Sequence, residues 1–496
     1  MTAMDGENSS ERLKSAVRSG TFATLATHVI GQVAQLVILA ILYRLVSPAE
    51  FGLFGLAVPI LMFLRMFASG GLHVATVGHA ELTESQLGGM FWLNLAAGLV
   101  TTAIAAAVAP LAAQIYDVPE LQKLLLALAA TSLAGALAAQ QQAVLERRLR
   151  WGRLSMFRIA AMLLGGVVAV AAAWRGAGVQ ALVAQMYAEL VALAVLCGLA
   201  GAWPGWRFST AGLRGVVQFG GLYLASSVVF YLVQYGDKLL LGWLVGDRLP
   251  EQVGFYTQAF NWTMKPVFLL TTPLSGVALA TLARARGDRA TRESLVLAFN
   301  RLAAVLMLPI GAGLMIVAPE AIVVLGGPDW SPAANVLRVL AATILVQAFI
   351  NLTGSLLSAT GNAAQLVRLS LGYAGWMLLT FGIGLYLGDQ QGQPALGLAL
   401  GYSLGLLTAF VPALVYCLRC VDIDRRIWFW NLRPAAQAAA AMAALVLAYH
   451  LIWVNWMDGP LVLLLCSEVT LGVVSYCWFA RKELQWVLTQ LGQLRR

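Results

Sequence analysis

Charged residues are scarce in this chain of 496 residues: Asp, Glu, Lys and Arg make up 11% of the sequence, and hydrophobic residues make up 60%. A soluble domain carries about 25% charged residues, so the composition excludes a globular protein whose whole surface faces water. The apolar residues gather in stretches of roughly 20, the length at which an α-helix crosses about 30 Å of hydrocarbon. The sequence therefore predicts an all-α polytopic membrane protein.

Lysine is rare as well, and none of the five lysines follows a glycine. A phosphate-binding P-loop needs that Gly-Lys pair, so direct ATP hydrolysis by this chain is excluded. The five cysteines lie in or at the ends of apolar stretches, where a disulfide framework has no purpose. Cys417 and Cys420 form a CxxC motif, but zinc would need further ligands nearby. We expect no metal site and no cofactor.

Fourteen apolar stretches are long enough to span a membrane. The expected spans are Gly20–Tyr43, Phe51–Gly71, Leu87–Ala112, Leu121–Val144, Leu154–Trp174, Val179–Trp203, Val217–Val245, Gly254–Leu282, Leu295–Ala318, Ala334–Leu357, Gln365–Leu387, Pro394–Leu418, Pro434–Asn455 and Gly459–Ala480. Residues 1–19 are polar and lack a short apolar core with a cleavage site, so we expect them to remain as a cytoplasmic tail. The first span then acts as a signal anchor.

Basic residues concentrate on one side of the predicted membrane. The two ends of the chain and the gaps after even-numbered spans contain or directly flank 22 Lys and Arg residues, whereas the gaps after odd-numbered spans contain or directly flank four. Basic residues near span ends are retained in the cytoplasm, so the pattern predicts that both termini are cytoplasmic. Topology and attraction to anionic membrane lipid then explain the net charge of +9, and no nucleic acid partner is expected.

An internal repeat is visible in the spans. Phe51–Ala57 and Val253–Ala259 both read apolar, Gly, apolar, aromatic, any, any, Ala, and each opens a span. Six spans separate the copies, and an even number gives the halves the same orientation, related by an axis along the membrane normal. The alternative is chance similarity among Gly- and Ala-rich helices. The predicted regions are an N-terminal six-helix lobe at 20–203, a C-terminal six-helix lobe at 217–418, an appended helix pair at 434–480 and an interfacial cytoplasmic helix at 481–496.

Glycine recurs every four residues in the twelfth expected span, at Gly397, Gly401 and Gly405. Small residues at this spacing let two membrane helices approach closely. We therefore predict that this span packs tightly against a neighbour.

Several short motifs resemble those of a transporter superfamily. They are Leu45–Gly52, Tyr116–Leu121, Leu145–Leu149, Asp237–Gly242, Gly254–Tyr256 with Ala259, and Pro266 with Pro273–Ser275. Their order, together with fourteen spans, resembles the multidrug/oligosaccharidyl-lipid/polysaccharide exporter superfamily and, within it, the Wzx-type flippases of bacterial O-antigen and exopolysaccharide assembly. The resemblance runs from Gly20 to about Asp288; beyond that, only the span number and the signs of the loop charges agree.

The resemblance implies two six-helix lobes around a central cavity that opens alternately to each side of the bacterial inner membrane. The implied substrate is an undecaprenyl-pyrophosphate-linked oligosaccharide, whose lipid tail stays in membrane lipid while its glycan is exported for O-antigen, capsule or exopolysaccharide assembly. The implied partners are other polysaccharide-assembly membrane proteins. The implied energy source is a gradient of H⁺ or Na⁺ or the membrane potential, and the chain is expected not to be an enzyme.

Cationic side chains inside spans are the candidate substrate-binding residues, since an ion there costs at least about 2.5–3.5 kcal/mol and normally faces a cavity or a partner. The candidates are Arg65, Lys238, Lys265 and Arg301. Arginine is favoured for bidentate contact with the diphosphate. Two candidates have a structural alternative, because Arg301 can be a cytoplasmic flank and Lys238 can pair with Asp237 or extend towards the interface.

Acidic side chains inside spans are the candidate ion-coupling residues. Glu189 lies midway along the sixth span, and Asp237 is a weaker candidate because a lysine follows it. The alternative for Glu189 is a neutral carboxyl hydrogen-bonded to Tyr187 or to a neighbouring helix. A lone histidine such as His450 is expected to be a packing element, and Glu468 in the last span has no assigned role.

Two other functions stay open at this point. A multidrug cation antiporter of the same superfamily usually has twelve spans and acidic cavity residues, so the basic set in this chain argues against it. A membrane glycosyltransferase or polymerase would need a catalytic loop, for which Asp422 and Asp424 form a DxD motif. Beside Arg425 and Arg426, this motif is more typical of a solvated charged loop.

Overall fold

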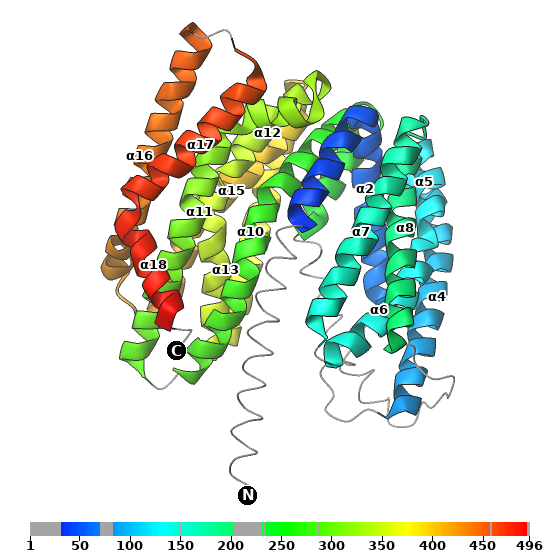
Figure 1. The fold of residues 1–496 in the computed structure, drawn as a ribbon, viewed down its shortest axis with the longest axis horizontal. Helices are drawn as coiled ribbons and strands as arrows, with labels where there is room; N and C mark the ends of the chain where they lie inside the picture. Colours follow the sequence, from blue (N-terminus) through cyan, green and yellow to red (C-terminus); the bar gives the residue numbers. More distant parts are fainter. Residues whose placement is uncertain are drawn as a thin grey trace, which may run out of the picture. The chain divides into compact units, whose positions relative to one another are not determined.

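The computed structural model describes residues 31–69, 83–148, 150–202, 231, 234–285, 288–456 and 459–493. Every regular element in these ranges is a helix (Figure 1). The chain divides into two compact units, Met1–Val253 and Gly254–Arg496. The predicted all-α class is confirmed, and each unit has its own set of packed helices.

Unit 1 contains a bundle of long helices. Its described helices are Gly31–Leu45, α2 (Pro48–Ser69), α4 (Glu84–Tyr116), α5 (Pro119–Ala129), α6 (Thr131–Arg147), α7 (Trp151–Trp174), α8 (Val179–Cys197) with the π-helical η1 (Gly198–Ala202), and residues 234–245. Helix α4 packs on α5 and α6, and α8 packs on α6 and α7. Thr83 starts α4 with a capping box, since its side chain accepts from the Gln86 N–H and Gln86 reaches back to the Thr83 N–H.

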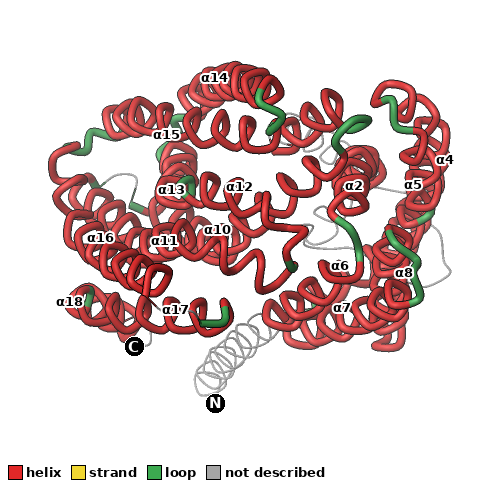
Figure 2. The backbone as a smooth tube through the Cα atoms, turned by 90° about the horizontal axis from the view of Figure 1, so that it is seen from above, coloured by secondary structure: helices red, strands yellow, loops and turns green. Residues whose placement is uncertain are grey.

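Unit 2 is built around α11. Its helices are α10 (Pro250–Arg284, whose first turn belongs to unit 1), α11 (Arg289–Gly326), the 3₁₀ turn η2 (Pro328–Trp330), α12 (Ser331–Ala341), α13 (Ile344–Ala359), α14 (Ala363–Gln390), α15 (Pro394–Cys420), α16 (Arg425–Trp456), α17 (Leu461–Phe479) and α18 (Arg481–Gln493). Helix α11 contacts α12, α13, α16 and α17 (Figure 2). Asp288 caps α11, and hydrogen bonds from the side chain and backbone of Thr291 lower the pKa of its carboxyl by favouring the charged form.

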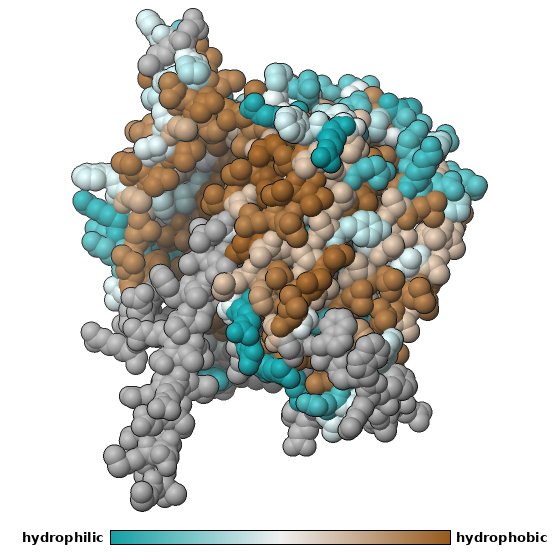
Figure 3. Space-filling view, turned by 45° about the vertical axis from the view of Figure 1, so that its right-hand side comes forward, coloured by the Kyte–Doolittle hydropathy of each residue, from teal (hydrophilic) through white to brown (hydrophobic). Residues whose placement is uncertain are grey.

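The helices have the length and composition of membrane spans. Within the described ranges, eleven helices pass this test, or twelve if α12 and α13, bent by 46°, form one broken span. The expected spans Gly20–Tyr43 and Val217–Val245 lie partly outside the described residues, so the count of fourteen remains a prediction, as does the cytoplasmic position of both termini. Large apolar side chains lie on the surface, as for a protein solvated by lipid (Figure 3).

One predicted boundary is wrong. The sequence places residues 319–333 in a long gap between two spans, but α11 continues through Pro319 to Gly326, and α12 begins at Ser331. A proline removes one backbone hydrogen bond and can bend a helix, but the turns on either side preserve it in a membrane bundle. The correction moves Glu320 from a presumed loop into a helix.

The repeated segments occupy equivalent places in their helices. Pro48 begins α2 and Pro250 begins α10, and in each helix the repeated segment starts three residues later, at Phe51 and Val253. Proline is favoured in the first helical turn, because its missing N–H has no intrahelical partner there. The shared helix start supports the repeat as more than a similarity of composition.

Helices α14 and α15 make the close contact that the glycine spacing predicts (Figure 2). A Cβ atom on Gly397 would collide with backbone atoms of Gly384 and Gly388, and one on Gly401 would collide with the Thr380 carbonyl. Glycine is needed on both helices because the colliding atoms are backbone. The predicted tight packing of this span is confirmed.

Candidate functional site

Arg65 lies on α2 and extends over α6. Its guanidinium covers Gly135, where any Cβ atom would collide with it. The side chain is half-buried, and among the described residues it has no ion-pair or hydrogen-bond partner. An arginine in this condition inside a membrane protein is available to an anion.

Buried amides lie in the same unit as Arg65. The Asn94 Nδ2 atom on α4 donates to the Gln140 Oε1 atom on α6 at 3.0 Å. The Gln140 Nε2 atom and both amide atoms of Gln141 are buried without a hydrogen-bond partner in the described part of the chain. Such groups cost about 1–3 kcal/mol each when they stay unsatisfied, so they favour a hydrogen-bonding ligand or water. We predicted only ionisable residues here; the run of three glutamines inside the fourth span was the missed signal.

Lys238 and Asp237 lie together on the helical segment 234–245. Their Nζ and Oδ1 atoms are 3.6 Å apart, and the two side chains are 3% and 1% exposed. The Lys238 ammonium also lies 5.3 Å from the ring centroid of Tyr235. Because the two opposite charges compensate each other in the described state, neither is a free ion. The substrate role of Lys238 and the coupling role of Asp237 stay predictions.

Aromatic residues join this segment to α2. The Tyr231 hydroxyl donates to the Pro59 carbonyl, and the Tyr231 ring lies 5.5 Å from Phe63, two residues before Arg65. Tyr231 also stacks on Tyr235 at a centroid distance of 4.5 Å. Tyr231 therefore contacts α2 at Pro59 and also packs on Tyr235 in the segment that carries Asp237 and Lys238.

Glu189 lies on α8 against α7. A Cβ atom on Gly165 would be 3.1 Å from the Glu189 Cβ atom, so glycine allows the two helices to approach here. Tyr187 donates to the Ala127 carbonyl at 2.6 Å and not to Glu189, so the Tyr187 alternative is not the arrangement seen. Glu189 remains a half-buried carboxyl whose coupling role is a prediction.

Lys265 lies on α10 and belongs to unit 2. Its Nζ atom is 6.0 Å from the ring centroid of Trp262, and the side chain is half-buried. A cation at this distance over an aromatic face gains about 0.5–1 kcal/mol at an exposed site. Such a contact leaves the ammonium free to bind an anion as well.

Arg301 is fully engaged by the C-terminal helix. Its Nε and Nη2 atoms donate to the two carboxylate oxygens of Glu483 on α18 at 2.6 and 2.8 Å. The guanidinium also lies 4.5 Å from the ring centroid of Trp486. This bidentate pair holds α18 to α11. The substrate role of Arg301 stays a prediction, which would require the arginine to leave Glu483.

Breaking this pair will loosen α18. We expect Glu483→Ala and Arg301→Ala each to lower the apparent melting temperature in detergent, and the double variant to be no worse than the worse single variant. A charge-assisted bidentate contact gives a coupling energy of about 1–3 kcal/mol in such a double-mutant cycle. The control is Lys482→Ala, since Lys482 is exposed on the same helix. Strictly additive effects would contradict the pairing.

The DxD motif is part of the loop's own structure. The Asp422 carboxylate pairs with Arg289 at 2.7 Å, and the Asp424 carboxylate accepts from the backbone N–H of Arg426 at the start of α16. Each acid therefore has a separate structural partner, which agrees with the interpretation as a charged loop.

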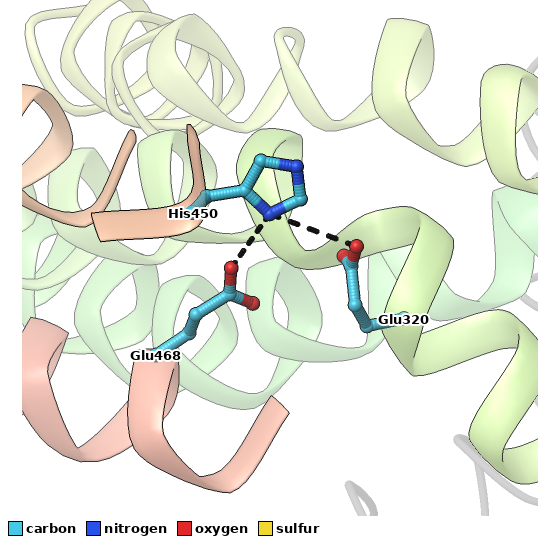
Figure 4. Close-up of side chains that lie close together, drawn as sticks. All are labelled: Glu320, His450 and Glu468. Atoms are coloured by element: carbon cyan, nitrogen blue, oxygen red, sulfur yellow. Dashed lines mark hydrogen bonds and ion pairs between the residues drawn. The ribbon is translucent and has the colours of Figure 1, made fainter. Parts of the chain in front are cut away.

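Three ionisable side chains that we did not connect from the sequence meet in unit 2. The His450 Nδ1 atom on α16 lies 2.7 Å from the Glu468 Oε1 atom on α17 and 3.7 Å from the Glu320 Oε1 atom on α11 (Figure 4). His450 is therefore more than an isolated packing element, and Glu468 has a partner. No local sequence signal connects the three residues, because they lie on three different helices.

Solved structures with similar folds are membrane transporters. The lipid II flippase MurJ in an inward closed conformation is similar with a TM-score of 0.69 at 13% sequence identity, covering 95% of this chain and 99% of that one. A multidrug resistance MATE family transporter of the MOP superfamily is similar with a TM-score of 0.61 at 16% identity, covering 79% and 94%. The chain therefore has the fold of this class of transporter.

The family is shown by the sequence comparison. The model of the polysaccharide biosynthesis protein family matches residues 41–335, and the chain belongs to this family. The teichuronic acid biosynthesis protein TuaB of Bacillus subtilis is 24% identical over 88% of this chain and 89% of its own length. The lipopolysaccharide biosynthesis protein WzxC of Escherichia coli is 24% identical over 74% of each chain. The resemblance to Wzx-type proteins within the multidrug/oligosaccharidyl-lipid/polysaccharide (MOP) exporter superfamily is confirmed.

Proposed function

We propose that this protein moves an undecaprenyl-pyrophosphate-linked oligosaccharide across the bacterial inner membrane by alternating access, driven by an ion gradient or the membrane potential. The observation that carries the proposal is the half-buried Arg65 guanidinium, which lacks an anionic partner among the described residues and lies in the unit that holds the Gln140 and Gln141 amides. A guanidinium suits a diphosphate, and the amides suit the hydroxyl groups of a sugar.

Each repeated helix carries a half-buried cation, although not at equivalent positions of the repeat. Arg65 lies 17 residues after Pro48, and Lys265 lies 15 residues after Pro250. The difference of two residues amounts to about 3 Å along a helix. Both helices therefore carry a half-buried cation at nearly the same distance from the helix start, but two residues also turn a helix by about 200°, so the two side chains extend from different faces. Their charge and depth support an anionic substrate, and the symmetry of the repeat does not add to that support.

The two acidic candidates for ion coupling differ in whether a cation lies beside them. Glu189 is the stronger candidate to bind the coupling H⁺ or Na⁺, because it has no neighbouring cation along α8. Asp237 would have to exchange Lys238 for the coupling ion, so we assign it a secondary role. Membrane lipid and other polysaccharide-assembly membrane proteins are the partners that fit this function.

Deletion of the gene in its native host tests the proposal. We expect undecaprenyl-pyrophosphate-linked repeat units to accumulate and surface polysaccharide to fall, both reversed by the gene carried on a plasmid. Mass spectrometry of extracted lipid and quantification of surface glycan measure the two effects. Unchanged glycan together with increased drug sensitivity would instead identify a multidrug antiporter, the function of the MATE transporter with a similar fold.

A further inference from the structure

We propose that Glu320, His450 and Glu468 form a binding site for one divalent first-row transition metal ion, with Zn²⁺ as the representative ion. The site lies where α16 and α17 pack on α11 (Figure 4). It is separate from the residues assigned to substrate and coupling above, so it goes beyond the proposed function.

The three helices place one ligand atom each within reach of a common ion. The ligand atoms lie within 4.8 Å of one another, and the two carboxylate oxygens lie 2.7 and 3.7 Å from the His450 Nδ1 atom. A Zn²⁺ ion with bonds of about 2.0–2.2 Å holds its ligand atoms about 3.3–3.5 Å apart. The two observed distances lie on either side of this value, so small side-chain rotations would complete the geometry.

Burial and unsatisfied oxygens point to a ligand. The Glu468 side chain is 0% exposed and the Glu320 side chain is 6% exposed. Each carboxylate makes one contact to His450, and its Oε2 atom is buried with no hydrogen-bond partner among the described residues. Buried carboxylates are costly unless they are paired or coordinate a metal.

Charge balance favours a divalent ion. Within the described ranges, no Lys or Arg pairs with either carboxylate. Beside the site, the Tyr449 hydroxyl on α16 donates to Ser467 on α17 at 2.9 Å, and this contact adds no charge. Two carboxylates and a neutral imidazole balance the charge of one divalent cation, so the complex would be neutral in apolar surroundings. The imidazole selects Zn²⁺ and similar ions over Na⁺, Mg²⁺ and Ca²⁺, which prefer all-oxygen sites.

The site has a definite depth in unit 2. Glu320 lies six residues before the end of α11, His450 six residues before the end of α16, and Glu468 seven residues after the start of α17. These spacings correspond to about 9–11 Å along each helix from one end of the bundle. A bound metal would cross-link three helices at this depth and hold the C-terminal pair to α11.

Metal binding by the purified full-length protein tests the proposal. After treatment with a chelator in detergent, we expect Zn²⁺ to bind with one ion per chain in calorimetry and elemental analysis, and to raise the apparent melting temperature. Glu468→Gln and Glu320→Gln keep side-chain size and remove one anionic ligand, so each should weaken binding at least tenfold to a hundredfold. Circular dichroism and gel filtration of each variant establish that it is folded.

Two controls separate this site from adventitious binding. Glu120→Gln removes an exposed carboxylate in unit 1, and Cys466→Ser removes an exposed thiol two residues from Glu468; both variants should bind Zn²⁺ like the parent protein. The proposal would be overturned if the parent protein bound no stoichiometric Zn²⁺. It would also be overturned if folded Glu468→Gln and Glu320→Gln bound Zn²⁺ as tightly as the parent protein, or if Cys466→Ser lost binding.

Discussion

Replacing Arg65 by alanine will reduce glycan export by tenfold or more while the protein still inserts into the membrane. A hydrogen bond to a charged group contributes about 1.5–3 kcal/mol, which corresponds to roughly a tenfold to hundredfold loss of affinity for the diphosphate. The measurement is surface glycan in a deletion strain that carries each variant, normalised to the amount of transporter in the membrane fraction. Lys265→Ala should impair export in the same direction, and the double variant should be the most defective.

The controls address charge and position. Arg175→Ala also removes one positive charge from unit 1, but Arg175 is exposed in the turn after α7, so export should stay normal. Arg65→Lys keeps the charge and loses the planar fork, so we expect partial activity. Normal export by Arg65→Ala, Lys265→Ala and the double variant would show that neither cationic side chain binds the substrate.

Replacing Gly397 by leucine will destabilise unit 2 strongly. The new side chain would begin at a Cβ position that collides with the backbone of α14 at Gly384 and Gly388, so neither rotamer changes nor side-chain shifts can relieve the clash. Overpacking usually costs about 1–3 kcal/mol, and a clash with two backbone segments belongs at or above the upper end. We expect a lower yield of monodisperse protein and a lower apparent melting temperature in fluorescence-detected gel filtration.

Gly382→Leu is the matched control, on the exposed face of the partner helix α14. Gly382 lies on α14, is exposed, and a Cβ atom there would meet nothing within 4 Å. This variant should keep or slightly raise stability, because leucine has a better helix propensity than glycine by roughly 1 kcal/mol. If both variants were equally stable, the close α14–α15 contact would be wrong.

Much of the fold follows from the sequence because its strongest signals are local. Apolar stretches of membrane length predict the helices directly, and the spacing of Gly397, Gly401 and Gly405 predicts one tight helix contact that the structure confirms. The end of α11 was harder to predict, because a proline such as Pro319 is typical of a helix end when the sequence is considered alone. Packing of α11 on several neighbours outweighs the single hydrogen bond that the proline removes.

The candidate site was less predictable because partners are set by tertiary structure. Ionisable residues in spans identified Arg65, but nothing local shows that Gly135 makes room for its guanidinium or that Glu483, 182 residues from Arg301, binds that arginine. His450 and Glu468 gave no local signal of a cluster because Glu320 lies 130 residues before His450 along the chain. Such long-range convergence becomes visible only when the helices are assembled.

The matching starts of α2 and α10 have a consequence for how the two copies of the repeat differ. Both helices begin at a proline three residues before the repeated segment, so the two segments share one register. In this register the position in α10 that corresponds to Arg65 is Val267, and Lys265 lies two residues before it. Two residues turn a helix by about 200°, so the two cations extend from different faces of their helices. The copies therefore share a backbone register but differ in the chemistry of the side chains on it, and a substitution in one copy changes one half of the protein alone.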